Sequence, residues 1–196
     1  MTETEELLRI LKENKSLQFI LEQTKELGMP NWYLGGGGIV QTVWNQKHGF
    51  ESEIGIKDYD LVYYDVNDIS YEAEDVFIQK GKELFKNIIT PVEIRNQARV
   101  HLWYNSRPGN HASRLIDQYK SVEEAISTWP TTATAIGVRK EMDGKFQVYA
   151  PFGLEDLFSL VVKPNKKLIT EKIYQNKVNR WIKVWPNLKI VPWNGE

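Results

Sequence analysis

The sequence has no cysteine and only three histidines among its 196 residues. The absence of cysteine excludes disulfide bonds, thiolate nucleophiles and cysteine-ligated metals. The histidines are scattered along the chain and do not have the spacing of zinc ligands. We therefore expect neither a disulfide framework nor a zinc site.

Long apolar runs and a strong net charge are also absent. No apolar stretch approaches the ~20 residues that cross a bilayer, and the acidic first six residues do not resemble a secretory signal. The net charge is −1, so no overall field attracts the chain to nucleic acid or to a membrane. We expect a cytoplasmic protein with no membrane partner. Its length fits a single domain over residues 1–196, with a core at about 30–105, N-terminal helices and a C-terminal helical and hairpin extension.

Local charge is less even than the total. From Lys163 to Lys189 there are eight basic residues and one acidic residue, Glu171. Two interpretations remain open: a solvated helix face, which is the more common case, or a lip that attracts phosphate.

Helical and strand-like patterns alternate along the chain. The predicted helices cover 7–27 (divided near 14–16), 39–48, 72–87, 121–127 and 167–184. The predicted strands cover 32–34, 59–64 and the segment that starts at 91, with a hairpin formed by 135–139 and 146–149. The segment 97–104 is ambiguous between strand and helix. This mixed order predicts an α/β (α+β) fold, with a small mixed sheet and helices packed on one side.

Four glycines, 35–38, lie between a predicted strand and a predicted helix. A helix N-terminus has unsatisfied N–H groups, and glycine lets the backbone approach a phosphate closely. Gly36 and Gly37 are therefore candidate phosphate contacts, although a tight turn without a ligand remains an alternative. The run fits neither the P-loop pattern nor the dinucleotide fingerprint, so a dinucleotide-binding oxidoreductase is disfavoured.

Asp58 and Asp60 begin the predicted strand 59–64. Residues i and i+2 of a strand share a face, so these carboxylates would lie ~7 Å apart and repel each other. A divalent cation would relieve the repulsion, because Mg²⁺ binds carboxylate oxygens. Glu93 lies between two apolar residues on a later strand and would complete the cluster if the two strands are neighbours. Exposed carboxylates without a metal remain the alternative for each.

Two arginines follow Glu93. Arg95 would share a strand face with Glu93 and pair with it. Arg99 is a candidate for nucleotide phosphate binding, because a guanidinium group suits phosphate geometry.

The order of these motifs resembles the signature of the DNA polymerase beta-like nucleotidyltransferase superfamily. Leu34–Gln41 followed by Lys57–Val62 is especially similar to the head domain of tRNA nucleotidyltransferases. A closer resemblance, to a bacterial nucleotidyltransferase-like family first catalogued as a domain of unknown function, covers nearly the whole chain through segments 42–44, 58–63, 95–103, 129–134, 150–158, 180–181 and 185–186. The resemblance implies that Gly36 and Gly37 match the paired glycines, and that Asp58, Asp60 and Glu93 match the catalytic, metal-binding carboxylates.

The resemblance also implies a reaction: transfer of a nucleoside monophosphate from an NTP to a hydroxyl, with Mg²⁺ or Mn²⁺ as cofactor and release of pyrophosphate. The acceptor is not identified and is a small molecule, an RNA end or a protein. An inactive nucleotide-binding or regulatory protein with the same fold is the alternative. The chain departs from the superfamily in its four glycines and in the longer spacing to Asp58, and it is too short to include the helical domains that grip tRNA.

Overall fold

The computed structural model describes residues 1–105 and 115–195. The helices are α1 (Glu3–Leu11), α2 (Lys15–Gln23), α3 (Gly37–His48), α4 (Tyr71–Leu84), α5 (Val100–Tyr104), α6 (Val122–Ile126), α7 (Glu155–Phe158) and α8 (Glu171–Trp181). The strands are β1 (Tyr33–Gly35), β2 (Tyr59–Tyr63), β3 (Val92–Asn96), β4 (Gly137–Lys140), β5 (Phe146–Tyr149), β6 (Val161–Val162) and β7 (Lys189–Ile190). Two short 3₁₀ turns are η1 (Thr24–Leu27) and η2 (Gln97–Arg99).

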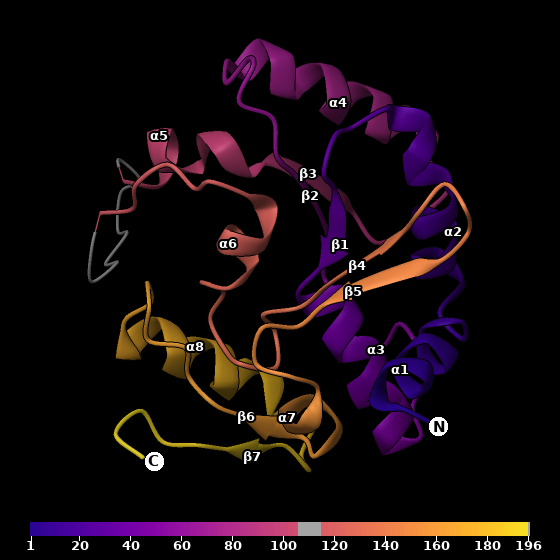
Figure 1. Cartoon of the computed structure of the whole chain (residues 1–196). Helices are drawn as coiled ribbons and strands as arrows, with labels where there is room; N and C mark the ends of the chain where they lie inside the picture. Colours follow the sequence, from indigo (N-terminus) through magenta and orange to yellow (C-terminus); the bar gives the residue numbers. More distant parts are fainter. Residues whose placement is uncertain (106–114, 196) are drawn as a thin grey trace.

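Five strands form one mixed sheet in the order β3-β2-β1-β4-β5 (Figure 1). Strands β2 and β3 are parallel and are connected through α4, whereas the other pairs are antiparallel. The register places Gly35 opposite Asp60, and Asp60 opposite Glu93. The end of β1, the start of β2 and the start of β3 are therefore neighbours, as the carboxylate hypothesis requires.

Alternation along β2 assigns its side chains to two faces of the sheet. Leu61 and Tyr63 belong to the main hydrophobic core, and Val62 belongs to a second, smaller cluster. Because side chains two positions apart share a strand face, Asp60 lies on the face of Val62. The main core covers one face of the sheet, and the polar residues belong to the other.

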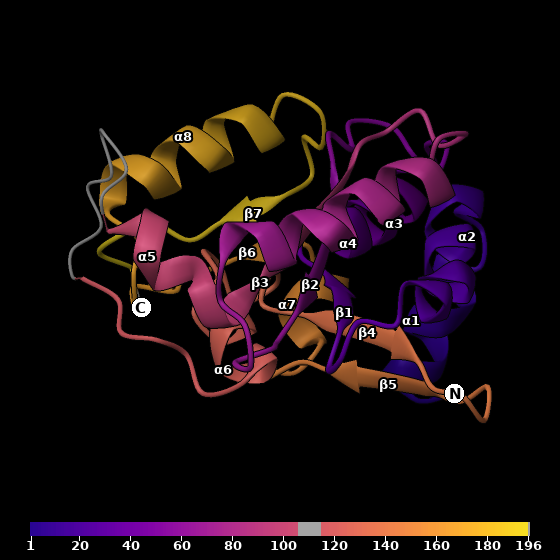
Figure 2. The ribbon, with the colours of Figure 1, turned by 90° about the horizontal axis from the view of Figure 1, so that it is seen from above.

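Helices cover both faces of the sheet, so the expectation of helices on one side only is wrong. The main core contains apolar residues of α1, α2, α3 and α4. On the opposite face, Val122 and Ile126 of α6 pack with Tyr33 and Val62. Figures 1 and 2 show α6 on the side of the sheet away from α3 and α4. Sequence periodicity indicates which residues of a helix are buried, but not against which face they pack.

Asn14 explains why the first helical segment divides where the sequence predicts. Its side chain accepts a hydrogen bond from the N–H of Leu17 and so caps α2. The same side chain donates to the hydroxyl groups of Thr42 and Tyr59 at 2.9 and 3.0 Å. Asn14 is fully buried, and these bonds satisfy its polar atoms while they join α2 to α3 and β2. The end of the segment at Gly28, where φ is 68°, is also as predicted.

The C-terminal region differs from the sequence prediction in two respects. Helix α8 begins only after Thr170, whose hydroxyl caps it by accepting from the N–H of Ile173. Strands β6 and β7 form a separate parallel pair that the sequence pattern does not predict. Trp181 and Trp185 pack edge-on against Trp44 at centroid distances of 5.4 and 5.3 Å and belong to the main core.

In the part of the chain that the structure describes, no helix combines the length and apolar character needed to cross a membrane.

Candidate active site

A cavity of about 740 Å³ lies on the polar face of the sheet. This volume is within the range of small-ligand sites. The cavity is lined by Gly36, Gly37, Asp58, Asp60 and Glu93, together with residues of η2, α5 and α8 and with the segment around Trp129. The structure thus brings five of the six predicted site residues to one cavity, and Arg99 is not among its lining residues.

The glycine turn leaves the N-terminus of α3 open. Gly36 is the residue before the helix, with φ 63° and ψ −134°, a conformation that essentially only glycine adopts. No side chain caps α3, whereas α1, α2, α4, α6 and α8 each begin with a Thr, Asn or Ser cap. The first N–H groups of α3 therefore remain available to an anion beside the cavity. The turn is also close to Asp60, because a Cβ atom added at Gly36 would lie 3.3 Å from Asp60 Oδ2.

Close packing explains why the run has more than two glycines. A Cβ atom on Gly38 would approach the ring of Tyr59 to 2.6 Å, so α3 can contact β2 only with glycine there. Gly36 and Gly37 line the cavity, and Gly38 serves helix–strand packing.

Asp60 is half-buried, and its environment disfavours the charged form. Desolvation and, to a smaller extent, the negative charges of Asp58 and Glu93 together raise the pKa of Asp60 to about 7, against the opposing effects of Lys177 and Arg95. The cavity therefore holds a carboxylate that the protein by itself stabilises poorly as an anion. Either a proton or a bound cation would relieve this.

Glu93 is less buried than Asp60, although the two residues are directly opposite in the β2–β3 register. Its side chain is 47% exposed, and Oε2 lies 3.5 Å from Arg95 Nη2. This pair confirms the predicted contact between Arg95 and Glu93. Glu93 lines the cavity from β3, which is an edge strand of the sheet.

The donor set suits a hard divalent cation bound together with its substrate. Within residues 1–105 and 115–195, no group of three or more His, Cys, Asp or Glu side chains is close enough to hold a metal ion by itself. Mg²⁺ usually takes only one or two protein carboxylates and completes its coordination with substrate phosphates and water. Asp58 and Asp60 on one face of β2, beside an open helix N-terminus, fit that requirement.

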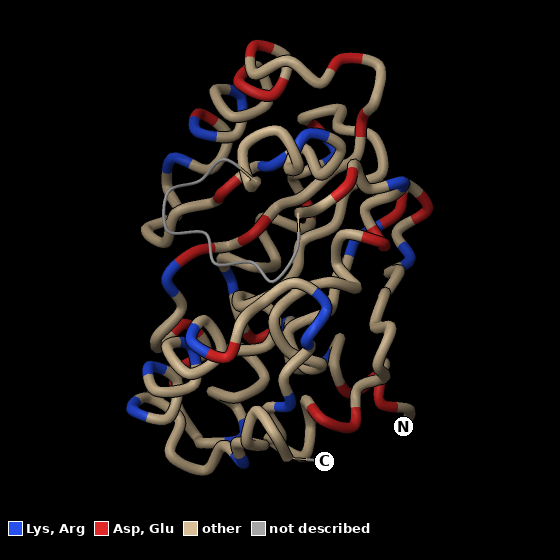
Figure 3. Tube along the Cα trace, turned by 90° about the vertical axis from the view of Figure 1, so that its left-hand side faces the viewer, with Lys and Arg blue, Asp and Glu red and all other residues tan. Residues whose placement is uncertain are grey.

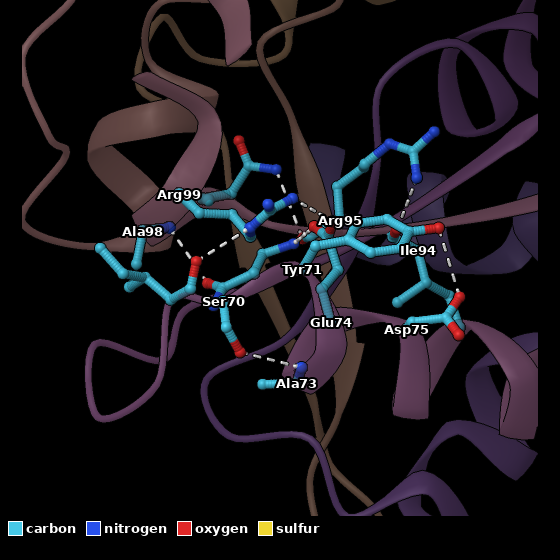
Figure 4. A network of polar contacts seen from close by, with 12 residues as sticks. Ser70, Tyr71, Ala73, Glu74, Asp75, Ile94, Arg95, Ala98 and Arg99 are labelled. Atoms are coloured by element: carbon cyan, nitrogen blue, oxygen red, sulfur yellow. Dashed lines mark hydrogen bonds and ion pairs between the residues drawn. The ribbon is translucent and has the colours of Figure 1, made fainter. Parts of the chain in front are cut away.

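Arg99 lies outside the cavity in a network of its own (Figure 4). Its Nη1 is 2.6 Å from Oε2 of Glu74, and its Nε donates to the carbonyl of Ile69 at 3.1 Å. The other oxygen of Glu74 accepts from the N–H of Asn96 at 2.8 Å. Arg99 thus connects η2 to α4, and the structure does not bring it to the predicted nucleotide site.

Helix α8 brings two basic residues to the cavity that the sequence interpretation did not single out. Lys177 and Arg180 line it beside Trp181. Burial lowers the pKa of Lys177, as does the charge of Arg180, whereas Asp60 and Asp58 raise it. The signal in the sequence is the basic run 163–189, for which a lip that attracts phosphate is one of the two interpretations.

Gln41 is a third cavity residue that the sequence interpretation did not single out. It lies in α3 behind Gly37, and it lines the cavity although it is only 6% exposed. Its side-chain oxygen is buried and has no hydrogen-bond partner among the described residues. Such an atom is costly in a folded protein unless a ligand or water satisfies it.

Comparison with known proteins agrees with this geometry. A family model described as nucleotidyltransferase matches residues 22–190. One solved structure, whose title states that it reveals a CCA-adding enzyme head domain, is 25% identical with a TM-score of 0.75, and the match covers 96% of this chain and 95% of that one. No curated protein matches the sequence.

The chain belongs to this nucleotidyltransferase family, because the family model covers most of its length. The expected polymerase beta-like nucleotidyltransferase fold and the transferase class are confirmed. Enzymes of this class transfer nucleoside monophosphate groups.

Proposed function

We propose that the protein transfers a nucleoside monophosphate from an NTP to a hydroxyl acceptor and releases pyrophosphate. Asp58 and Asp60 hold Mg²⁺ or Mn²⁺, and the backbone of Gly36 and Gly37 contacts the phosphates. The observation that carries the proposal is the convergence of the open α3 N-terminus, which attracts an anion, with a half-buried carboxylate that needs a cation. A metal–triphosphate complex satisfies both requirements at once.

The chain's own residues then have distinct tasks. The N-terminus of α3 positions the phosphates through N–H groups that no side chain caps. Asp60, in the cavity, fixes one side of the phosphate complex. Glu93, which is partly exposed, is placed to accept the proton of an incoming hydroxyl. When bound, the metal would neutralise charge on the phosphates and orient them for in-line attack.

The first test is nucleotide binding, which needs no knowledge of the acceptor. The thermal shift caused by each of the four NTPs is measured with and without Mg²⁺ for the wild type and for Asp58→Asn/Asp60→Asn. A ligand at 100 times its dissociation constant should stabilise the protein by about 2.7 kcal/mol. We expect a Mg²⁺-dependent shift that the double variant loses. The ligand-induced shift is compared, and not the melting temperature itself, because removing these charges changes the stability of the free protein.

Asp75→Asn is the matched control, since Asp75 is a side chain of α4 outside the cavity. It should keep the full shift. A double variant that still responds to NTP and Mg²⁺ like the wild type would contradict the proposal.

The second test is turnover. Transfer of label from α-³²P-NTP is followed separately into pools of small metabolites, RNA and protein. RNA ends are tested first, because the similar solved structure is titled as a CCA-adding enzyme head domain. Labelling of one pool by the wild type but not by the double variant would identify the acceptor class. Mg²⁺-dependent binding without transfer to any pool would favour the regulatory alternative.

A further inference from the structure

Helix α8 carries two basic side chains that line the cavity, and buried residues on either side of them anchor the helix to the rest of the fold. Tyr174 is fully buried, and its hydroxyl group contacts the carbonyl oxygens of Val162 and Val191 at 2.8 and 2.7 Å. Trp181 packs against Trp44 in the core. Between these two anchors, Lys177 and Arg180 are three residues apart and both line the cavity. The fold therefore fixes the side of α8 from which these side chains extend.

Lys177 faces the carboxylates without touching them. The charges of Asp60 and Asp58 are among the main influences on Lys177, and Lys177 is the strongest favourable influence on Asp60. Yet among the described residues neither Lys177 nor Arg180 has a carboxylate oxygen within the 4.0 Å of an ion pair. Opposite charges are thus kept apart across a cavity instead of neutralising each other.

A ligand with both signs of charge would complement this arrangement. A cation is attracted to Asp58 and Asp60, and an anion to Lys177 and Arg180. Phosphate groups that share a metal ion have this distribution, and both ammonium and guanidinium groups are good phosphate donors. In a structural ion pair the two side chains are in contact, as Arg99 and Glu74 are at 2.6 Å.

We infer that α8 forms the pyrophosphate subsite, in which Lys177 and Arg180 bind the β- and γ-phosphates of the NTP. This inference rests on the proposed function and extends it, because it assigns the leaving pyrophosphate to one side of the cavity and the acceptor to the other. The hydroxyl oxygen of the acceptor forms a bond to the α-phosphorus, and the bond from that phosphorus to the bridging oxygen breaks. The electron pair leaves with pyrophosphate, whose charge Lys177 and Arg180 stabilise, and the hydroxyl proton goes to Glu93.

In-line displacement requires that the attacking and leaving oxygens lie on opposite sides of the α-phosphorus. With pyrophosphate at α8, the acceptor enters from the side of β3 and α5. In Figure 1, α5 lies near the β3 side of the sheet, whereas α8 lies on the other side of α6, beside β6 and β7. Glu93, on the edge strand β3, is then on the acceptor side, as its role requires.

The test uses inorganic pyrophosphate and a nucleoside monophosphate as separate probes. Dissociation constants of pyrophosphate, ATP and AMP are measured in Mg²⁺ for the full-length wild type, Lys177→Met and Arg180→Met. Lys172→Met is the matched control, since Lys172 is an exposed residue of the same helix that does not line the cavity. Lys177→Arg keeps the charge if removal of the buried amine disturbs folding.

We expect Lys177→Met to weaken pyrophosphate and ATP binding about tenfold or more, the loss of a charge-assisted hydrogen bond. Arg180→Met should weaken both by a smaller factor. AMP binding should change less than twofold in either variant, and Lys172→Met should bind all three ligands like the wild type. Lys177→Arg should bind pyrophosphate better than Lys177→Met.

Two results would overturn the inference. Unchanged pyrophosphate binding by Lys177→Met and Arg180→Met, in a protein that still binds ATP through Asp58 and Asp60, would contradict the inference alone. A wild type that binds neither ATP nor pyrophosphate in Mg²⁺ would contradict the proposed function, and this inference with it.

Discussion

Two pairs of oppositely charged residues in this molecule differ in whether their side chains are in contact. Glu74 and Arg99 are in contact at 2.6 Å, with side chains only 3% and 12% exposed. Asp60 and Lys177 each shift the pKa of the other but form no ion pair, and both line the cavity. Glu74 and Arg99 each make a further hydrogen bond, and we call these two residues the closed pair. Asp60 and Lys177 are not in contact, and we call them the open pair.

The difference teaches how to separate structural from functional charge. A buried pair in contact has already used its electrostatic attraction to join two elements, here α4 and η2 (Figure 4). In a pair whose members are not in contact, both charges can still interact with a bound ligand. Acidic and basic residues are interspersed over most of the chain (Figure 3), so the density of charge alone does not reveal which pair is which.

The largest expected effect is on turnover, at the open pair. Asp60→Asn should lower the rate of label transfer about 10³-fold or more, because metal stabilisation of the reacting phosphate contributes several kcal/mol. The variant should remain folded, which circular dichroism checks in the same samples. A rate within tenfold of the wild type would mean that Asp60 is not part of the reaction.

At the closed pair the expected effect is on stability. Glu74→Ala leaves the Arg99 guanidinium and the N–H of Asn96 without their acceptor. Breaking a buried pair in this way costs about 3–5 kcal/mol of unfolding free energy, which urea denaturation measures. Lys177→Met, at the open pair, should lose much less. Equal losses at the two pairs would remove the distinction between them.

The pH dependence of stability should differ between the wild type and Asp60→Asn. The pKa of Asp60 is raised from 3.8 to about 7, so the folded state binds the proton more tightly than the unfolded state does. The stability that this carboxyl contributes is complete below pH 3.8 and is lost as pH rises towards 7.

Without metal, Asp60→Asn should therefore gain stability relative to the wild type between pH 4 and 7, by roughly 4 kcal/mol at most. Melting temperatures at pH 4, 5.5 and 7.5 test this. A constant difference across that range would show that Asp60 is not strained by its surroundings.

A smaller effect is expected at the glycine turn. Gly36→Ala should cost about 1–3 kcal/mol, because φ is 63° and ψ is −134°, and the new Cβ would lie 3.1 Å from Trp129. It should also reduce the NTP-induced thermal shift. Gly49→Asn is the control, since Gly49 is in the left-handed region with open space around it. Its thermal shift should match that of the wild type.

The smallest effect is predicted for nucleotide affinity when Arg99 is changed. Arg99→Lys should alter the dissociation constant of Mg²⁺-ATP less than twofold, although it should lower the melting temperature. A tenfold loss of ATP affinity would show that Arg99 contributes to nucleotide binding, and that the pair of Glu74 and Arg99 is not purely structural.

The local sequence pattern was sufficient to predict most helices and strands, and also the candidate site residues in and beside β1, β2 and β3. The glycine turn, Asp58, Asp60 and Glu93 lie in or beside the predicted strands, and the pairing of β1 with β2 and of β2 with β3 brings them together. The position of Arg99 outside the cavity could not be predicted, because its partner, Glu74, is 25 residues earlier in a helix whose orientation the sequence does not reveal. Lys177 was missed for the same reason, because its place opposite Asp60 depends on how α8 docks against the core.

In the proposed site, Asp58 and Asp60 hold a divalent cation together with the phosphates of an NTP. Electron paramagnetic resonance of Mn²⁺, titrated with and without ATP, measures this binding. We expect the wild type to bind Mn²⁺ weakly alone and tightly with ATP, and Asp58→Asn/Asp60→Asn to abolish the tight binding. Equal Mn²⁺ binding by the double variant in the presence of ATP would contradict the proposed role of the two carboxylates.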